Sequence, residues 1–508
     1  MEKDPKILLK RAIELDPDLA SAHFKLGILH QSEKDFETAL KYFEKSVSLN
    51  QSYPEAECEL AIELSRLKKF EEARDHFLNA LELNPNFIKA YFNYALLLVE
   101  LKDFEEAKNN FDKVAEIDQN YSPAYFNKAK LLSNPDDFDD AKKNYETAID
   151  IKEDYAQAHY YLAKLLFGGK ATSHDGSPVD KRDWENAKFH FLRAISIDPK
   201  CPKSLYNYAR ILFYESKLKE SKSYLLKAIK LLPQYSKAHY LIARIFEDEK
   251  QLEQAIEHYN KSIEFFPTNH KALYHLGKLY FYQDKLKEAE NNLRAALKIH
   301  SQNAKTHYYL AKILTLDQDA SLAKKHFYKA LEINPEFAQA YFDLAVHAEK
   351  TGDINEAKIH FQKATDVEQN FAEAYFNLAR LSSSPSDYDL AERNFETAIE
   401  IKDDFDECHY YLGKLLAKGE RMTKDGTLVI KPKLDLAEKH FREAIRINPK
   451  DFKSYFELGI LLAKEKKYKD AFMSLNMSIK INPKFADGHY ELAVLLMNKS
   501  AKKIISKS

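Results

Sequence analysis

Apolar and polar residues alternate along this chain with the spacing of paired amphipathic helices. In the stretch YFNYALLLVELKDFEEAKNNFDKVAEIDQN, which begins at Tyr91, an aromatic-led apolar segment is followed by a short polar turn. A second segment then carries Ala107 and, four residues later, Phe111. Residues three and four apart share one face of an α-helix. The pattern therefore predicts two helices joined by a short turn.

The same order of residues recurs along the chain. It is found in YFDLAVHAEKTGDINEAKIHFQKATDVEQN from Tyr341 and in YHLGKLYFYQDKLKEAENNLRAALKIH from Tyr274. A fixed period of this length is typical of repeat proteins, in which each unit stacks on the next. Composition agrees, because 508 residues contain only 11 Gly and 16 Pro but 31 Tyr and 32 Phe. A chain so poor in turn residues is expected to be helical throughout.

These stretches resemble the tetratricopeptide repeat (TPR) family, whose 34-residue motif has a small residue at position 8, Ala at 20 and an aromatic residue at 24. We number each repeat from 1 to 34, starting at Ala20. Position 20 is Ala in every complete repeat except the sixth, which has Ser221. Position 8 is occupied by Gly27, Ala61, Ala95, Ala129, Ala163, Ala209, Ala243, Gly277, Ala311, Ala345, Ala379, Gly413, Gly459 and Ala493. The resemblance covers essentially the whole chain.

The resemblance implies an all-α fold, a right-handed superhelical α-solenoid of about 14 helix-turn-helix repeats. Each repeat would contribute a helix A and a helix B, and small residues at positions 8 and 20 would let the two approach closely. The expected segments are 1–19, a partial repeat (helix B); 20–250, a first array with an insertion at 168–183; 251–485, a second array with an insertion at 418–433; and 486–508, a terminal helix A with a short tail.

The chain also has a second period, which is longer than one repeat. YETAIDIKEDYAQAHYYLAKLL from Tyr145 and FETAIEIKDDFDECHYYLGKLL from Phe395 start 250 residues apart. Seven 34-residue repeats account for all but 12 of these 250 residues. In each copy the 12 additional residues form an insertion between helix A and helix B of one repeat. Asp175-Gly176 and Asp425-Gly426 lie at their centres, and Asp-Gly flanked by Thr, Val and Ile favours a β-hairpin with positive φ at the turn. We therefore expect two copies of a seven-repeat cassette, each with one β-hairpin.

The resemblance also implies that helix A lines a concave groove, chiefly with positions 2, 5, 9 and 12. Position 5 is aromatic in thirteen of fourteen repeats, Cys58 being the exception. Position 9 is basic in eight: Lys130, Lys164, Arg210, Arg244, Lys278, Lys312, Arg380 and Lys414. In four consecutive repeats position 2 is basic as well. The candidate ligand-binding residues are Lys203, Tyr206, Arg210, Lys237, Tyr240, Arg244, Lys271, Tyr274, Lys278, Lys305, Tyr308 and Lys312.

Cations and aromatic rings in alternation would complement an extended acidic peptide, a phosphorylated or glutamate-rich tail, or another anionic polymer. The alternative is that the rings pack helix A against its neighbours while the lysine heads are solvated. Globally the chain is balanced, with 77 basic and 79 acidic residues, so we expect no general attraction to nucleic acid or membrane.

No other chemistry emerges from the sequence. The position 4 histidines (His23, His159, His239, His307, His409 and His489) are each expected to stand alone as packing residues without a metal. No nucleotide-binding or hydrolase motif is present, so we expect no cofactor and no enzyme activity. The three scattered cysteines indicate a reducing compartment, and no signal peptide or membrane span is recognisable. A cytoplasmic location is therefore expected.

The resulting hypothesis is a non-catalytic scaffold for protein-protein interaction. A second hypothesis is a structural protein that polymerises head-to-tail into a superhelical filament. Counting repeats puts Met1 at position 16 and Ser500 at position 15, so one end would complement the other. A third is that these repeats belong to a larger enzyme, such as a glycosyltransferase.

Overall fold

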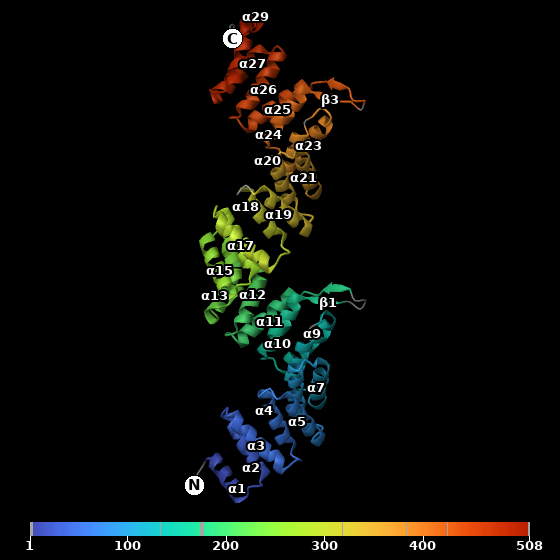
Figure 1. The fold of residues 1–508 in the computed structure, drawn as a ribbon, viewed down its shortest axis with the longest axis vertical. Coiled ribbons are helices and arrows are strands. Elements are labelled where there is room, and N and C mark those ends of the chain that lie inside the picture. The colour runs from blue at the N-terminus through green and yellow to red at the C-terminus, as the bar shows by residue number, and fades with distance from the viewer. Residues whose placement is uncertain are drawn as a thin grey trace. The chain divides into compact units, whose positions relative to one another are not determined.

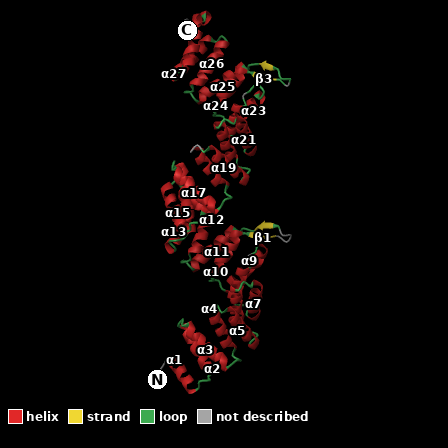
Figure 2. Cartoon of the chain, viewed as in Figure 1, coloured by secondary structure: helices red, strands yellow, loops and turns green. Residues whose placement is uncertain are grey.

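The computed structural model describes residues 4–132, 134–172, 177–316, 319–382, 384–423 and 425–505. Its contacts divide the chain into two compact units, Met1–Phe265 and Phe266–Ser508. In each unit consecutive helices pack in pairs, and each pair packs on the next, as an α-solenoid does (Figure 1). Among the described residues, strands occur only in two short hairpins, one in each unit (Figure 2). The predicted fold class is confirmed. The boundary between cassettes at residues 250 and 251 stays a prediction.

The first unit contains α1 (Pro5–Leu15), α2 (Ala20–Ser32), α3 (Phe36–Leu49), α4 (Pro54–Arg66), α5 (Phe70–Leu83), α6 (Ile88–Glu100), α7 (Phe104–Ile117), α8 (Ser122–Leu131), the short 3-10 helix η1 (Pro135–Asp137), α9 (Phe138–Ile151), α10 (Ala156–Gly168), β1 (Lys170–Thr172), β2 (Pro178–Asp180), α11 (Trp184–Ile197), α12 (Pro202–Tyr214), α13 (Leu218–Leu231), α14 (Ser236–Asp248) and α15 (Leu252–Phe265). From α2 onward the even-numbered helices are helix A of a repeat and the odd-numbered ones are helix B.

The second unit contains α16 (His270–Tyr282), α17 (Leu286–Ile299), α18 (Ala304–Leu316), α19 (Ala320–Ile333), α20 (Ala338–Lys350), α21 (Ile354–Val367), α22 (Ala372–Leu381), α23 (Tyr388–Ile401), α24 (Asp406–Lys418), β3 (Glu420–Met422), β4 (Leu428–Ile430), α25 (Leu434–Ile447), α26 (Phe452–Lys464), α27 (Tyr468–Ile481), α28 (Ala486–Met497) and α29 (Lys499–Ile505).

Small residues and one ring hold the two helices of a repeat together. Ala61 at position 8 and Ala73 at position 20 are fully buried, and the ring of Phe77 at position 24 fills the space beside them. Where position 8 is Gly413, a Cβ on the backbone would lie 2.8 Å from Cε1 of Phe441. Ser221 replaces the usual Ala without loss, because its hydroxyl donates to the carbonyl oxygen of Ala209 at 2.8 Å.

Local signals set the helix ends. Asp35, Asp103 and Asp353 cap a helix B by accepting a hydrogen bond from the backbone N–H three residues on. Helix A ends where position 15 takes the left-handed conformation that reverses the chain. The residues that do so are Lys34, Lys68, Lys102, Ser216, Lys250, Asp284, Gly352 and Lys466.

The two hairpins are antiparallel, and each lies between helix A and helix B of its repeat as predicted (Figure 2). In the second, Glu420 pairs with Ile430 and Met422 with Leu428. Gly426 has the positive φ expected at the turn, at 81°. Asp175-Gly176, the matching turn of the first hairpin, lies outside the described residues.

Each hairpin packs on the preceding repeat, and this arrangement was not predicted. Helix A of that repeat is short, since α8 and α22 have 10 residues where most have 13. The N–H of Met422 donates to the carbonyl oxygen of Pro385 at 2.7 Å, in the turn that follows α22. Tyr388 beneath this turn is only 2% exposed, and Phe138 in the first unit only 3%. The shortened helix therefore leaves the space that the hairpin occupies.

Four of the position 4 histidines are paired, so the prediction that each stands alone is wrong for these. Nε2 of His239 donates to the carbonyl oxygen of Pro233 at 3.0 Å, which leaves its Nδ1 to accept from Nδ1 of His258 at 2.9 Å. The partner is always at position 23 on helix B. The pairs are His159 with His190, His239 with His258, His307 with His326, and His409 with His440.

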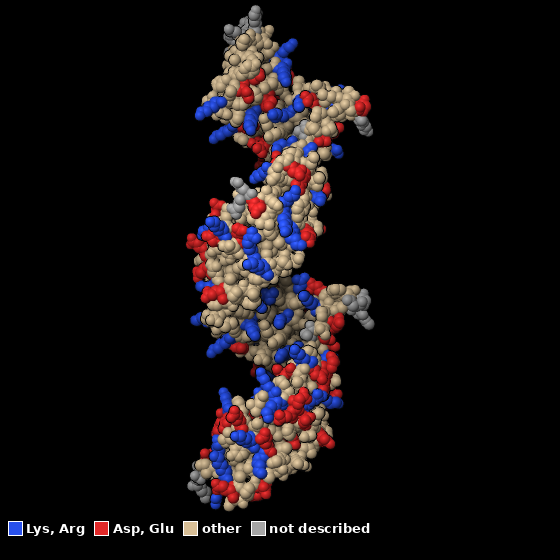
Figure 3. All heavy atoms as spheres, in the orientation of Figure 1, with Lys and Arg blue, Asp and Glu red and all other residues tan. Residues whose placement is uncertain are grey.

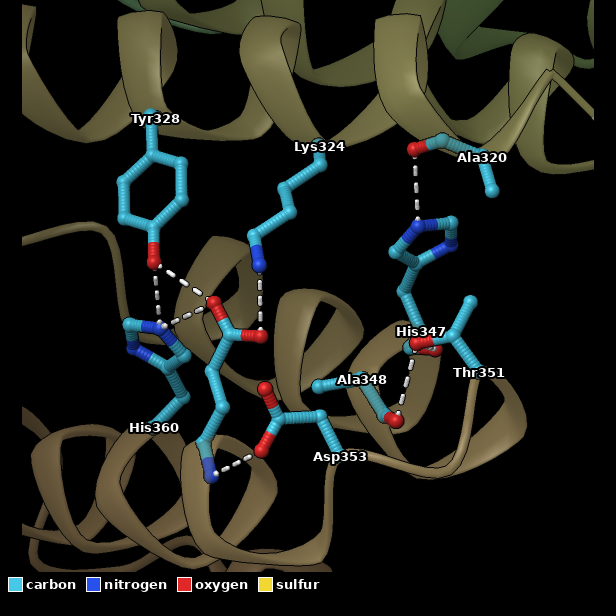
Figure 4. A network of polar contacts seen from close by, with 9 residues as sticks. Ala320, Lys324, Tyr328, His347, Ala348, Thr351, Asp353 and His360 are labelled. Carbon is cyan, nitrogen blue, oxygen red and sulfur yellow. Dashed lines mark hydrogen bonds and ion pairs between the residues drawn. The ribbon is translucent and has the colours of Figure 1, made fainter.

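Polar contacts also connect successive repeats. In the second unit Lys324 of α19 donates to Glu356 of α21 at 2.7 Å, and the hydroxyl of Tyr328 donates to the same carboxylate at 2.7 Å (Figure 4). Nε2 of His347 lies 3.0 Å from the carbonyl oxygen of Ala320. In the first unit Lys188 with Glu215 and Lys222 with Glu249 span neighbouring repeats in the same way. These charged groups are engaged in holding the stack together.

We predict that Gly419→Ala destabilises the second hairpin by about 2–4 kcal/mol. The residue has φ of 56°, and a Cβ would lie 2.4 Å from backbone atoms of Lys431 and Pro432. Gly352→Ala is the matched control, since its φ is 88° but no atom lies within 4 Å of a Cβ. Hydrogen exchange should show faster exchange at β3 and β4 for the first variant only. Equal effects of the two substitutions would contradict the packing of Gly419.

We also predict that the fold loses stability in acid below about pH 6.5. Burial, followed by the partner ring, lowers the pKa of His190, His258, His326 and His440 to about 4. Since the unfolded chain then binds more protons between pH 6.5 and 4, the stability present above pH 6.5 is lost across that interval, by roughly 1–2 kcal/mol per pair. The other charged groups near these rings are Lys142, Asp183, Lys222, Glu257, Lys261, Arg294, Lys325, Lys439 and Glu443.

Replacing the four helix B histidines by Asn tests this, because Asn292 occupies position 23 in another repeat and donates to the carbonyl oxygen of Glu288. Thermal unfolding at pH 7 and pH 5 should differ less for this variant than for the native chain. An unchanged difference would show that the histidine pairs are not the groups that titrate.

Candidate functional site

The predicted groove residues divide between the two units. Helices α12 and α14 carry six of them in the first unit, and α16 and α18 carry six in the second. The position 2 lysines are exposed in both: Lys203 and Lys237 in the first unit, Lys271 and Lys305 in the second. Among the described residues no carboxylate pairs with any of these four lysines.

The four candidate rings at position 5 pack within the stack and are half-buried or buried. Tyr206 lies 5.1 Å from the ring of Tyr235, and Tyr308 lies 4.9 Å from that of Phe337, each on the loop before the next helix A. Burial raises the pKa of Tyr206. Tyr240 and Tyr274 are half-buried in the same position of their repeats. All four rings therefore contribute to packing, and those of Tyr206, Tyr240 and Tyr274 also remain partly accessible at the helix A surface.

The position 9 cations stack on rings of two repeats. The guanidinium carbon of Arg210 lies 4.8 Å from the ring centre of Phe167, in the preceding repeat, and 5.7 Å from that of Tyr206. Arg244 lies 5.7 Å from Phe213 in the same arrangement. Sequence reasoning missed Phe167 and Phe213 as part of the site, although both occupy position 12, which the groove pattern includes.

In the second unit three position 9 cations are each paired with a different carboxylate. Nζ of Lys312 lies 3.2 Å from Asp343 at position 6 of the next repeat. The hydroxyl of Tyr308 also donates to Asp343, at 2.6 Å, so this candidate ring and candidate cation share one partner. Beyond the predicted residues, Arg380 pairs with Glu349 and Lys414 with Glu457 in the same unit.

In the first unit the corresponding positions are neutral. Position 6 after Lys130, Lys164 and Arg210 is Tyr161, Asn207 and Leu241 respectively. Among the described residues no carboxylate pairs with Lys130, Lys164 or Arg210. Arg210 instead donates to Oδ1 of Asn207 at 3.0 Å. The first unit therefore keeps uncompensated positive charge on its helix A surface.

Cavities coincide with this basic surface. One of about 360 Å³ is lined by Lys130, Tyr160, Tyr161 and Lys203, and another of about 410 Å³ by Lys130, Tyr161 and Lys164. Figure 3 shows blue lysine and arginine side chains around a hollowed part of the face over α10 to α12. The arrangement presents ammonium groups beside the faces of aromatic rings.

Within the described ranges, no three His, Cys, Asp or Glu side chains are close enough to hold a metal ion. Nor does any helix of the described residues combine the length and apolar character that crossing a membrane needs.

Solved structures that match this chain include YrrB, titled a TPR protein with an unusual peptide-binding site. The match has 19% sequence identity and a TM-score of 0.33, and it covers 36% of this chain and 95% of that one. A chain from the structure of the APC/C hetero-tetramer Cut9-Hcn1 matches at 15% identity with a TM-score of 0.37. The match covers 92% of this chain and 94% of that one. Yeast Tom70 matches at 17% identity with a TM-score of 0.33. The match covers 96% of this chain and 99% of that one. No curated protein matches this sequence.

Models of the tetratricopeptide repeat match along most of the chain. The matches described as tetratricopeptide repeat cover residues 20–53, 64–131, 122–155, 202–235, 274–336, 314–381, 372–405 and 440–472, and one described as TPR repeat covers 243–284. They keep the register expected from the sequence, with matches starting at Ala20, Ser122, Pro202 and Ala372, each at position 1. The chain therefore belongs to the tetratricopeptide repeat family.

Proposed function

We propose that this chain is a non-catalytic scaffold that holds an extended acidic segment of a partner protein along its helix A surfaces. Scaffolds of this family typically mediate protein-protein interaction and are typically non-catalytic. The observation that supports the finer proposal is the set of cations in the first unit that no carboxylate compensates among the residues the structure describes, namely Lys130, Lys164 and Arg210, together with exposed Lys203 and Lys237.

The chemistry of this surface favours an anion in an extended conformation. Position 9 cations recur once per repeat, at about the 8–10 Å spacing of packed helices, which is close to the Debye length of roughly 8 Å at physiological salt. Their potentials therefore reinforce one another along the stack. Arg210 is held over Phe167 and Tyr206, so binding an anion there orders few new rotamers.

The second unit is expected to contribute less to binding. Lys271 and Lys305 are exposed there, but Lys312 is paired with Asp343, and an acidic ligand would have to displace that carboxylate. Displacing a partner costs part of the free energy that binding gains. The proposal therefore places the stronger contacts on α12 and α14.

We predict that reversing Lys203 and Arg210 to Glu weakens binding of a fluorescein-labelled Glu-rich peptide at least tenfold. Reversing Lys305 and Lys312 should weaken it less. Binding by the native chain should also fall between 0.05 and 0.5 M salt, because exposed charges are screened. Fluorescence anisotropy measures the affinity, and far-ultraviolet circular dichroism checks that the helices persist.

The matched control reverses Lys219 and Lys230, two exposed lysines of α13, which is a helix B. It makes the same change in net charge away from the helix A surface. Equal affinity of the native chain and the Lys203/Arg210 variant, or an equal loss in the control, would rule out the proposed surface.

A further inference from the structure

The residues at position 9 of successive repeats, here called the position 9 stripe, change from apolar to basic along the first unit. In the second and third repeats it is Ile62 and Leu96, and from the fourth repeat onward it is Lys130, Lys164 and Arg210. Leu96 is 36% exposed, although it is a large aliphatic side chain. Packing within a repeat does not require an exposed Leu there, because the core is formed by positions 8, 20 and 24.

A cavity of about 600 Å³ lies at the apolar end of this stripe. Its apolar lining comes from Ile62, Leu96, Leu97, Val99 and Leu131 on three successive A helices and from Phe70 and Phe77 of α5. Its polar lining residues are Ser65, Arg66, Asn93, Glu100, Asn127 and Lys130. Binding sites for small groups commonly have volumes of about 300–1,000 Å³ and mostly apolar walls. This cavity is large enough for apolar side chains of a ligand.

Lys130 connects the apolar cavity with the basic surface. It lines the 600 Å³ cavity and also both smaller cavities beside α10. Its Nζ lies 5.5 Å from the ring centre of Phe126 and 6.0 Å from that of Tyr161. One ligand could therefore contact the apolar walls and the cations without leaving the surface of this unit.

We infer that the first unit recognises a bipartite extended segment of a partner, with apolar side chains in the cavity at α4, α6 and α8 and acidic side chains along α10 and α12. The inference rests on the proposed function and adds an order to the ligand. Charge complementarity selects an acidic block beside Lys164, Lys203 and Arg210. In the cavity Arg66 is already paired with Glu63, so the walls at Ile62 and Leu96 favour apolar side chains over an anion.

The geometry also sets a spacing. Neighbouring helices pack about 8–10 Å apart, and an extended chain rises about 3.3 Å per residue, so the ligand advances roughly three residues per repeat. From α6 to α10 is two repeats and from α6 to α12 is three. The apolar and acidic blocks should therefore be separated by roughly six to nine residues.

The test uses the full chain and three labelled synthetic peptides. The probe carries two Leu and, eight residues away, four Glu, with a Ser-Gly spacer. The first reference replaces the Leu by Ser, and the second places Leu and Glu side by side. We expect the probe to bind about tenfold more tightly than either reference, because burying apolar side chains in the cavity removes them from water.

Protein variants locate the effect. Ile62→Ser combined with Leu96→Ser should remove the advantage of the probe and leave the binding of the Ser reference unchanged. Leu78→Ser is the matched control, since Leu78 is 44% exposed on α5, a helix B. It should bind all three peptides as the native chain does.

The outcomes separate this inference from the proposed function. If the probe and the Ser reference bind equally, and both are weakened by reversal of Lys203 and Arg210, the bipartite inference is wrong and the proposed function stands. If none of the three peptides binds, both are overturned. Tighter binding of the peptide with adjacent blocks would overturn the spacing.

Discussion

The structure depends on how closely helix A and helix B approach within each repeat. Positions 8 and 20 face one another, and Ala61, Ala73 and Ala357 are examples of residues there that are fully buried. The ring at position 24 then fills the remaining space, as Phe77 and Phe361 do at 1% and 0% exposure. A side chain larger than Ala or Ser would separate the helices and expose that ring. Because each pair contacts mainly its neighbours, this one packing rule generates the stack by repetition.

The stack determines which charged residues are available to a ligand. Lys188, Lys222 and Lys324 occupy position 21 and are paired with Glu residues of the next repeat, so they hold repeats together. The position 9 cations lie on the other helix, where no such rule applies. Whether each is compensated depends on one neighbouring side chain, such as Asp343 beside Lys312 or Asn207 beside Arg210. A chain with a nearly balanced total charge thus carries a localised basic surface.

Much of the fold could be predicted from the sequence because its determinants are local. The repeat register, the helix pairs and the turn at Gly426 follow from residue types at fixed spacing. The histidine pairs were missed because their members lie on different helices, 19 residues apart for His239 and His258 and 31 for His159 and His190, so helical periodicity does not connect them. The carboxylate beside Lys312 was missed for a similar reason, since Asp343 lies in the next repeat. The helix A position of each candidate residue could be predicted from the repeat, but whether a carboxylate pairs with each cation could not, because that depends on contacts between repeats.

The two hairpins show how departures from the repeat depend on one another. A hairpin at β3 and β4 needs the short α22 beside it, because Met422 contacts the Pro385 turn that the missing helical residues would otherwise displace. A full-length helix A would collide with the strand, and a short helix without the hairpin would expose Tyr388. Each change alone is therefore destabilising, whereas both together are compatible. This coupling explains why the short helix and the hairpin occur together in both units, and why the recurring segment must be longer than one repeat.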